Sequence, residues 1–318
     1  MKNQLESLKD FTSVVADTGE FQKIAQFLPD DATTNPSLIL QAVQQPEYAD
    51  LFDAAILEAR SIGLTGEDLV EEISDVLAVS FGCEVLKIIK GRISTEVDAK
   101  LSFDTAGSIQ KAKKLIDMYE KRGISRDRIL IKLATTFECV QACKELENMG
   151  INCNMTLLFS FAQARAAAEA GATLISPFVG RIFDWFAKNG GGPYTMSTDP
   201  GVQSVRRIYE YYKKHNYKTI VMGASFRNKE QVLGLAGCDK LTIAPKLLAE
   251  LQASMEPVER MLKPLQDKGI AVCPLSESEF RWAMNEDPMA TEKLAEGIRN
   301  FHKDAEKLKG LIRAKIAY

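Results

Sequence analysis

The chain has 318 residues, of which 46% are hydrophobic and 26% are charged, with 40 basic against 43 acidic side chains and a formal net charge of −3. This apolar fraction is typical of a globular core, and it argues against a disordered, collagen-like or coiled-coil chain. A slightly acidic balance without a basic block disfavours a nucleic-acid-binding surface. An anionic ligand would therefore need a few locally placed Arg or Lys side chains.

The cysteines and histidines offer little for a metal site. Cys139 and Cys143 stand four residues apart and would share a helix face, but the six cysteines include no C-x-x-C pair, and the two histidines lie in charged surroundings. We expect reduced, mostly buried thiols and no metal. The charged N-terminus is unlike a signal peptide and no apolar run is long enough to span a membrane, so we expect a soluble, cytoplasmic protein.

Short apolar runs alternate with helical stretches along the chain. The eight predicted strands span 13–16, 32–34, 91–95, 128–131, 151–153, 172–175, 219–222 and 240–244. The predicted helices between them span 105–122, 137–149, 161–170, 202–214 and 228–236. Several of these helices stop at a glycine, which readily adopts the left-handed conformation that ends a helix.

Strands that alternate with helices pair in parallel through crossovers. Eight such units predict an α/β fold, a (β/α)8 TIM barrel, with a doubly wound open sheet as the alternative. No G-x-G-x-x-G motif follows the first strand, which disfavours a dinucleotide-binding fold. Two segments are too long for a single strand–helix unit of a barrel: residues 36–90, after the second strand, and residues 245–318, at the C-terminus. We assign both to extra helices. We expect one barrel domain over residues 1–318, with a loop at 189–193.

Polar side chains stand at the carboxyl end of nearly every predicted strand. They are Asp17, Asn35, Glu96, Lys132, Asn154, Ser176, Ser225 with Arg227, and Thr242. Singly, such residues could cap a helix or lie in a turn. Together they indicate an active site, because the carboxyl ends of barrel strands converge on the face where these enzymes react.

Lys132 is the sharpest of these signals, because it interrupts the apolar run 128–134. Apolar surroundings disfavour the ammonium form, and the neutral amine can attack a carbonyl to form a Schiff base. The plainer interpretation is a lysine that extends into solvent from a strand end. Lys87 and Lys90 are weaker candidates, because their spacing of three suits a solvated helix face.

An imine on Lys132 needs acid–base partners, and Glu96 and Asp17 are the natural pair. One carboxylate could act through a water held by Thr156, and the other could take the proton from a substrate hydroxyl. Arg181 and Arg227 follow late strands. Two guanidinium groups on adjacent units indicate an anionic ligand of sugar-phosphate size.

At these residues the chain resembles a transaldolase of the longer class I type, within the Schiff-base aldolase superfamily. The similar blocks are DATTNPSLI at 31–39, ILIKLATT at 129–136, GINCNMTLLFSFAQA at 150–164, ISPFVGR at 175–181 and MGASFRN at 222–228. The resemblance covers nearly the whole chain in order, and blocks of this length are specific.

The resemblance implies transfer of a three-carbon dihydroxyacetone unit between sugar phosphates in the non-oxidative pentose phosphate pathway, without cofactor or metal. Sedoheptulose 7-phosphate and glyceraldehyde 3-phosphate would give erythrose 4-phosphate and fructose 6-phosphate. Lys132 would form the Schiff base, Glu96 with Thr156 would handle a catalytic water, and Asp17 would serve the C–C step. The implied substrate-binding residues are Asn35, Thr33, Asn154, Ser176 and Phe178, with Arg181, Ser225 and Arg227 at the phosphate. Relatives of this length are often homodimers.

The chain departs from the family pattern after the lysine block, where Phe137 stands for a usual Trp and Cys139 for a usual Gly. Phe183 also stands where a leucine is common. The first pair could alter the helix packing behind the lysine. Some relatives are simple aldolases on free dihydroxyacetone, but they are shorter. Two other functions stay open, a phosphosugar isomerase that uses Glu96 as a base without a covalent step and a catalytically silent sugar-phosphate sensor.

Overall fold

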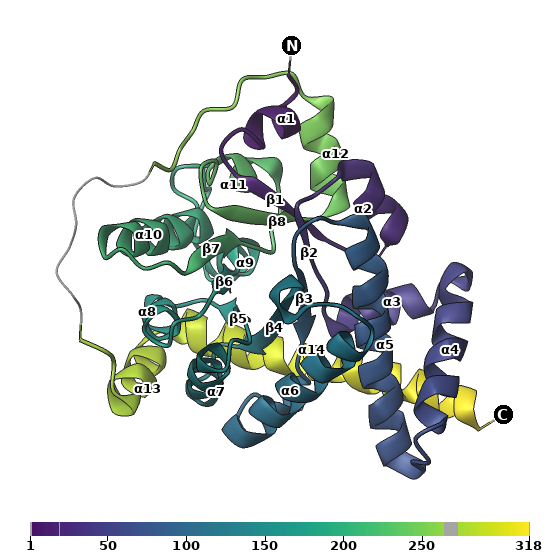
Figure 1. Ribbon diagram of the computed structural model, residues 1–318. Helices are drawn as coiled ribbons and strands as arrows, with labels where there is room; N and C mark the ends of the chain where they lie inside the picture. Colours follow the sequence, from purple (N-terminus) through teal and green to yellow (C-terminus); the bar gives the residue numbers. More distant parts are fainter. Residues whose placement is uncertain (1, 19, 264–272, 318) are drawn as a thin grey trace.

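The computed structural model describes residues 2–18, 20–263 and 273–317. Eight parallel strands close into a barrel in chain order, and β1 completes the circle by pairing with β8 (Figure 1). The strands are β1 (Ser13–Asp17), β2 (Asp31–Thr33), β3 (Ile93–Glu96), β4 (Ile129–Ala134), β5 (Cys153–Leu158), β6 (Leu174–Pro177), β7 (Ile220–Gly223) and β8 (Lys240–Ile243). The predicted (β/α)8 barrel is therefore confirmed, and the alternative, a doubly wound open sheet, is excluded.

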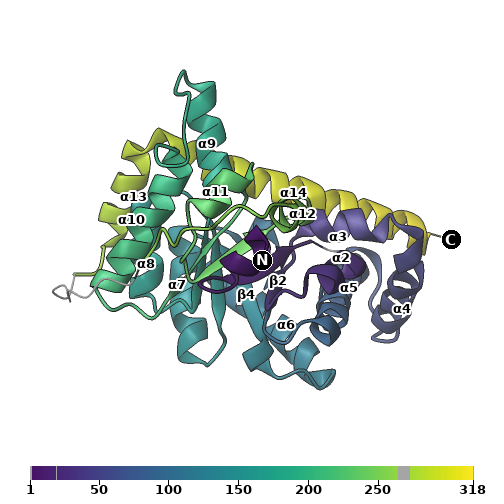
Figure 2. The ribbon, with the colours of Figure 1, turned by 90° about the horizontal axis from the view of Figure 1, so that it is seen from above.

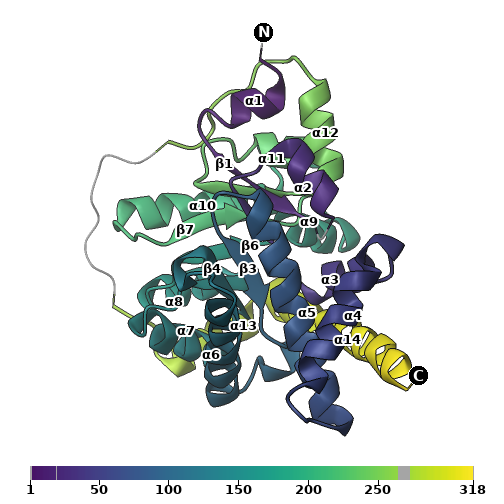
Figure 3. The same cartoon turned by 45° about the vertical axis from the view of Figure 1, so that its right-hand side comes forward.

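Helices surround this barrel on the outside (Figure 3). In chain order they are α1 (Gln4–Leu8), α2 (Phe21–Phe27), α3 (Pro36–Val43), α4 (Ala49–Arg60), α5 (Gly66–Ile88), α6 (Thr105–Lys121), α7 (Phe137–Asn148), α8 (Phe161–Glu169), α9 (Val179–Lys188), α10 (Pro200–Lys214), α11 (Lys229–Leu233), α12 (Pro245–Ala253), α13 (Glu277–Glu286) and α14 (Pro288–Ile316). Three 3-10 turns are η1 (Pro46–Tyr48), η2 (Ala99–Leu101) and η3 (Arg126–Arg128). No helix among the described residues combines the length and the apolarity needed to cross a bilayer.

The two long segments hold extra helices, as the sequence predicts. The segment after β2 contains α3, α4 and α5, and the C-terminal segment contains α12, α13 and α14. Helix α14 is the longest element, and it runs across the molecule from α13 to the C-terminus beside α4 (Figure 2). It contacts α3, α5, α9 and the strand β5. A helix from the end of the chain therefore reaches the barrel strands themselves.

Several predicted boundaries differ from the structure, and one helix was not predicted. The strand expected at 151–153 is β5 and continues to Leu158, because its polar residues point into the barrel and every residue of the strand is buried. The chain after β6 forms the helix α9, which contains Arg181 and which the sequence analysis did not predict. The helix expected at 228–236 ends at Leu233, and α11 is only one turn and a half.

The barrel interior is built in layers that follow from the two-residue period of a strand. Four buried apolar side chains form one layer: Val15, Leu130, Leu174 and Met222. Two residues further along β1, β4 and β6 stand Asp17, Lys132 and Ser176, which therefore point inward above that layer. The polar residues of the sequence analysis thus meet at the carboxyl mouth of the barrel.

The cysteines match the expectation of unpaired, mostly buried thiols. All six are free, and four of them are fully buried: Cys139, Cys143, Cys153 and Cys238. They fill gaps between the helices and the strands and act as small apolar side chains there.

Candidate active site

The carboxyl ends of the strands surround a pocket of about 400 Å³. Nine of the predicted site residues line it: Asp17, Thr33, Asn35, Lys132, Thr156, Ser176, Phe178, Arg181 and Ser225. Two more lie directly behind this wall, because Glu96 contacts Lys132 and Asn154 is bonded to Ser176. The structure therefore brings together side chains that the sequence spreads over more than half of its length.

Lys132 extends from the middle of β4 into this pocket and is only 5% exposed. Its Nζ lies 3.2 Å from Glu96 Oε2, because the two residues are register partners on the adjacent strands β3 and β4. Nζ also donates to the Thr34 carbonyl oxygen at 3.5 Å. The lysine is thus buried and paired, which excludes the interpretation of a lysine that extends into solvent. The rival Lys87 is exposed and pairs with Glu84 on α5.

Two carboxyl groups flank Lys132, and burial raises the pKa of both. The positive charges of Lys132 and Arg181 act in the opposite direction on each. Thr33 Oγ1 also donates to Asp17 Oδ1 at 3.1 Å, which favours the ionised form of Asp17. A buried carboxyl with a raised pKa can take up and return a proton, which is what general acid–base catalysis needs.

A chain of buried hydrogen bonds lies beside the lysine. Ser176 Oγ donates to Asn154 Oδ1 at 2.6 Å, and Asn154 Nδ2 donates to Ser94 Oγ at 3.0 Å. This chain fixes the orientation of the Asn154 amide. Thr156, further along β5, has a buried Oγ1 without a hydrogen-bond partner among the described residues. Because Thr156 also lines the pocket, its hydroxyl suits a water or a substrate oxygen.

Arg181 adds a second positive charge to the pocket, besides that of Lys132. Its guanidinium carbon lies 4.7 Å from the centre of the Phe178 ring and 5.6 Å from that of the Phe301 ring. Burial, with the positive charge of Arg227 nearby, lowers the pKa of Arg181. A half-buried guanidinium beside two rings is well suited to an anionic group such as a phosphate.

Arg227 does not line the pocket in this structure, and its guanidinium donates to Asp184 instead, with the closest contact at 2.8 Å. It still lies close to Arg181, because Gly180 lets the start of α9 approach the loop after β7. A Cβ at Gly180 would be 2.4 Å from the Ser225 carbonyl oxygen and 2.7 Å from Arg227 Cγ. A phosphate that engaged both arginines would therefore have to compete with Asp184.

Three lining residues were not named from the sequence: Met222, Ala224 and Phe301. Thr242, a polar residue at the end of the last predicted strand, also lines the pocket. Met222 and Ala224 lie at the carboxyl end of β7, where the barrel pattern could have found them. Thr242 Oγ1 lies 3.2 Å from Thr33 Oγ1 on β2. Phe301 belongs to α14, and no strand-end signal marks it.

The two departures after the lysine block contact other helices. Phe137 packs against Phe280 of α13, with ring centres 5.8 Å apart. The backbone N–H of Cys139 donates to Thr136 Oγ1 at 3.1 Å, and its buried thiol contacts the Ser102 carbonyl oxygen at 3.5 Å. These contacts tie α7 to its neighbours, whereas the strand register orients Lys132.

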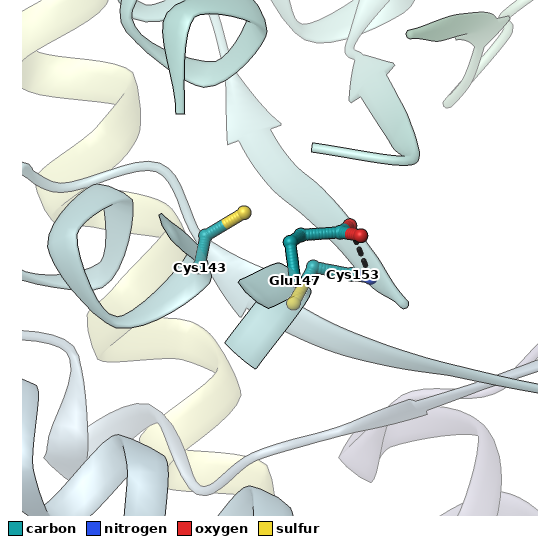
Figure 4. A group of neighbouring side chains, drawn as sticks. All are labelled: Cys143, Glu147 and Cys153. Atoms are coloured by element: carbon teal, nitrogen blue, oxygen red, sulfur yellow. Dashed lines mark hydrogen bonds between the residues drawn. The ribbon is translucent and has the colours of Figure 1, made fainter. Parts of the chain in front are cut away.

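One group of described side chains has metal-ligating atoms close together. The ligand atoms of Cys143, Glu147 and Cys153 lie within 4.8 Å of one another (Figure 4). The Glu147 carboxylate already accepts from the backbone N–H groups of Cys153 at 2.8 Å and Thr173 at 2.6 Å. A hydrogen bond with Cys143, together with burial, raises the pKa of Cys153. The group therefore fits a structural role better than a metal centre, because the Glu147 carboxylate holds the start of β5 and the chain before β6 by their backbone N–H groups.

Comparisons with known proteins match the whole chain. The family model described as transaldolase/fructose-6-phosphate aldolase matches residues 14–312. A transaldolase of Shewanella amazonensis is 59% identical over 317 residues, which cover 100% of both chains. A transaldolase of a Marinomonas species is 57% identical over 99% of this chain and 100% of its own. Transaldolase A of Escherichia coli K12 is 56% identical over 99% of this chain and 100% of its own. With a barrel that presents a buried lysine between two carboxyl groups, this chain belongs to the transaldolase/fructose-6-phosphate aldolase family.

Proposed function

We propose that this chain is a transaldolase that moves a dihydroxyacetone unit from a ketose phosphate to an aldose phosphate through an imine on Lys132. It would convert sedoheptulose 7-phosphate and glyceraldehyde 3-phosphate into erythrose 4-phosphate and fructose 6-phosphate. The observation that carries the proposal is the buried Lys132 amine 3.2 Å from Glu96 in a pocket that also contains Asp17 and Arg181. The full-length similarity to transaldolases supports it.

Imine formation needs a proton acceptor and a proton donor at the lysine. Nζ attacks the C2 carbonyl carbon of the ketose, and the resulting carbinolamine loses its oxygen as water when the C=N bond forms. Glu96 is in reach of Nζ, and it would take the amine proton and return it to the departing hydroxyl. The unpartnered Thr156 hydroxyl would hold the water on the pocket side.

Cleavage of the C3–C4 bond needs a second base, and Asp17 would fill this role. Asp17 would take the proton of the C4 hydroxyl, so that the aldose phosphate leaves with a C4 aldehyde. The electron pair of the broken bond passes into the protonated imine and gives an enamine. In the reverse direction the enamine attacks the acceptor aldehyde, and Asp17 returns the proton to the new hydroxyl.

The remaining pocket residues would hold the substrate in register with the lysine. Ser176 would present its hydroxyl to the dihydroxyacetone hydroxyls, and Asn154, directly behind it, orients that hydroxyl and would reach the substrate from there. Asn35 Oδ1 caps α3 by accepting from the Leu38 N–H at 2.9 Å, so its amide nitrogen is the end that can donate to substrate. The phosphate group would lie at the other end of the pocket, with Arg181, Ser225 and Arg227.

Borohydride trapping tests the covalent step. The protein is incubated with fructose 6-phosphate, reduced, digested, and the modified peptide is located by mass. We expect a three-carbon adduct on Lys132, and its loss in Lys132→Met but not in the exposed control Lys87→Met. If phosphosugar binding persists but no adduct forms, the result would favour one of the two alternative functions, a phosphosugar isomerase or a sugar-phosphate sensor.

We also propose that residues 1–318 act as one barrel domain and that the protein works as a homodimer in the cytoplasm, where sugar phosphates are made and used. The match to relatives of the same length over their whole chains supports the single unit. Light scattering of the purified protein tests the dimer, because a mass of one chain would contradict it.

A further inference from the structure

A buried threonine of β8, Thr242, lies close to Asp17, the base proposed for cleavage of the C3–C4 bond. Its side chain points into the barrel, because Thr242 is the register partner of Val15, which belongs to the interior apolar layer. Thr242 is only 4% exposed, and it lines the pocket that also contains Asp17 and Lys132. A valine would fill the same space without a polar group, and a buried hydroxyl is costly unless it is hydrogen-bonded. The hydroxyl of Thr242 therefore calls for a partner.

The partner is Thr33, and the two threonines form a short chain of hydrogen bonds that ends at Asp17. Thr242 Oγ1 lies 3.2 Å from Thr33 Oγ1, and Thr33 Oγ1 donates to Asp17 Oδ1 at 3.1 Å. Thr33 is the register partner of Asp17 on β2, whereas Thr242 comes from β8, the other neighbour of β1. Thr33 is only 3% exposed. The three side chains therefore meet at the inner face of three adjacent strands, shielded from solvent.

An ionised Asp17 fixes the direction of both hydrogen bonds. A carboxylate can only accept, and a hydroxyl has a single hydrogen to donate. Because Thr33 donates its hydrogen to Asp17, the hydrogen between the two threonines must come from Thr242. Hydrogen bonds in such a chain polarise one another, so the donation by Thr242 strengthens the bond from Thr33 to the carboxylate.

The chain favours an ionised Asp17 in one orientation. Burial raises the pKa of Asp17, and the hydrogen bond from Thr33 acts against burial because it stabilises the charged form. The same bond restrains rotation of the carboxyl group, because it holds one of the two oxygens. Oδ2 is then the more basic oxygen, and it is the one that would take the proton of the substrate C4 hydroxyl. A base held in the productive orientation accepts that proton more readily.

We propose that Thr242 is a positioning residue for cleavage of the C3–C4 bond, because its hydroxyl orients the Thr33 hydroxyl that holds Asp17 in place as the base. The inference rests on the proposed function and deepens it. Thr242 acts through Thr33 and Asp17, whereas imine formation depends on Glu96, which lies 3.2 Å from Lys132 Nζ. Loss of the Thr242 hydroxyl should therefore slow cleavage and leave imine formation unchanged.

Borohydride trapping of the full-length protein separates the two steps by the mass of the adduct on Lys132. A six-carbon phosphorylated adduct counts imine before cleavage, and a three-carbon adduct counts imine after the aldose phosphate has left. In a single turnover of fructose 6-phosphate, a dehydrogenase removes the glyceraldehyde 3-phosphate so that cleavage runs one way. Thr242→Val should form total adduct within twofold of the unmodified rate but convert the six-carbon into the three-carbon adduct about fivefold more slowly. The conversion rate does not depend on the fraction of folded protein, because only molecules that carry the imine are counted.

A second readout is the pH dependence of the conversion. On acidification, the conversion in Thr242→Val should begin to slow at a higher pH than in the unmodified chain, because Asp17 holds its proton more tightly once the support from Thr242 is lost. Thr242→Ser keeps the hydroxyl and should restore both the unmodified rate and the unmodified pH profile.

The matched control is Thr12→Val, which removes another buried threonine hydroxyl. Thr12 precedes β1, at the opposite end of that strand from Asp17, and its Oγ1 accepts from the Gly237 N–H at 2.8 Å. Its conversion rate should equal that of the unmodified chain. A conversion rate within twofold of the unmodified chain in Thr242→Val overturns the inference, and so does an equal loss in Thr242→Ser or Thr12→Val. Absence of any adduct in the unmodified chain would instead refute the proposed function.

Discussion

Replacement of Glu96 by Gln should slow imine formation about 100- to 1000-fold, within the range of general acid–base catalysis. Gln keeps the shape and can still accept a hydrogen bond, but it cannot carry the proton that Nζ loses. The Glu96 side chain is only 4% exposed and its Oε2 is 3.2 Å from Nζ, so solvent cannot easily replace it as the base. Asp17 lies in the same cluster, so it should partly replace Glu96 as the proton acceptor and preserve some of the rate of imine formation. The loss corresponds to about 3–4 kcal/mol in the activation free energy.

Rapid-quench trapping with borohydride follows this step directly, because it counts imine on Lys132 in a single turnover. The matched control is Glu84→Gln, which removes the same charge from a salt bridge with Lys87 on the surface of α5. We expect the control to form imine at the unmodified rate. Phosphate affinity should change little in Glu96→Gln, because the phosphate would lie near Arg181.

Imine formation at the full rate in Glu96→Gln would remove Glu96 from the mechanism. An equal loss in the Glu84→Gln control would point to a general effect of charge or folding. A third result, slow imine formation together with a large loss of phosphate binding, would mean that Glu96 organises the whole pocket rather than the proton transfer.

Three further predictions follow from the same contacts. Arg227→Ala should raise the KM for phosphorylated substrates about tenfold with little change for unphosphorylated fructose, and an equal change for both would contradict the phosphate assignment. Burial raises the pKa of Asp17 above its ordinary value of 3.8, so the folded chain binds more protons there than the unfolded chain and Asp17 contributes less stability as pH rises. Urea unfolding at several pH values should therefore show that Asp17→Asn gains stability relative to the unmodified chain as the pH rises above 3.8. A difference in the free energy of unfolding that does not change with pH would refute this. Lys309→Met should lower the free energy of unfolding by about 2–3 kcal/mol, because Asp98, which accepts from Lys309 Nζ at 2.9 Å, would stay half-buried without this partner; thermal unfolding with Lys307→Met, an exposed lysine of the same helix, as the control checks it.

Local pattern was enough to predict the barrel and most of its site. Lys132 interrupts an apolar strand, and the strand period of two then places its side chain above Leu130 inside the barrel. The same period places the side chain of Asp17 above that of Val15 inside the barrel, because Asp17 follows Val15 by two residues. Because the carboxyl ends of parallel strands converge in any closed barrel, residues that follow separate strands were expected to meet, and nine of them line one pocket.

The errors in the prediction lie where contacts between distant residues outweigh local preference. Helix α9 was missed because its first turn depends on the loop after β7, where the N–H of Gly180 donates to the Ser225 carbonyl oxygen at 2.8 Å. Strand β5 was cut short because Asn154 and Thr156 look like the end of an apolar run. Inside a barrel their polar side chains are buried against other polar groups, and the strand continues.

The sequence by itself determined the order of the strands, the presence of the extra helices and the choice of Lys132 as the candidate reactive lysine. Periodicity and family motifs both depend on residues that are close together in the chain, so they can be recognised without the structure. The sequence also predicted Glu96 as a partner of Lys132, and the structure supplied the strand register that brings them together. Only the tertiary structure decided that Asp184 holds Arg227 and that Phe301 covers the lysine. These contacts depend on strand register and on where α14 lies across the barrel. Such long-range packing leaves no trace in the local spacing of side chains, because it is fixed by how separate elements fit together.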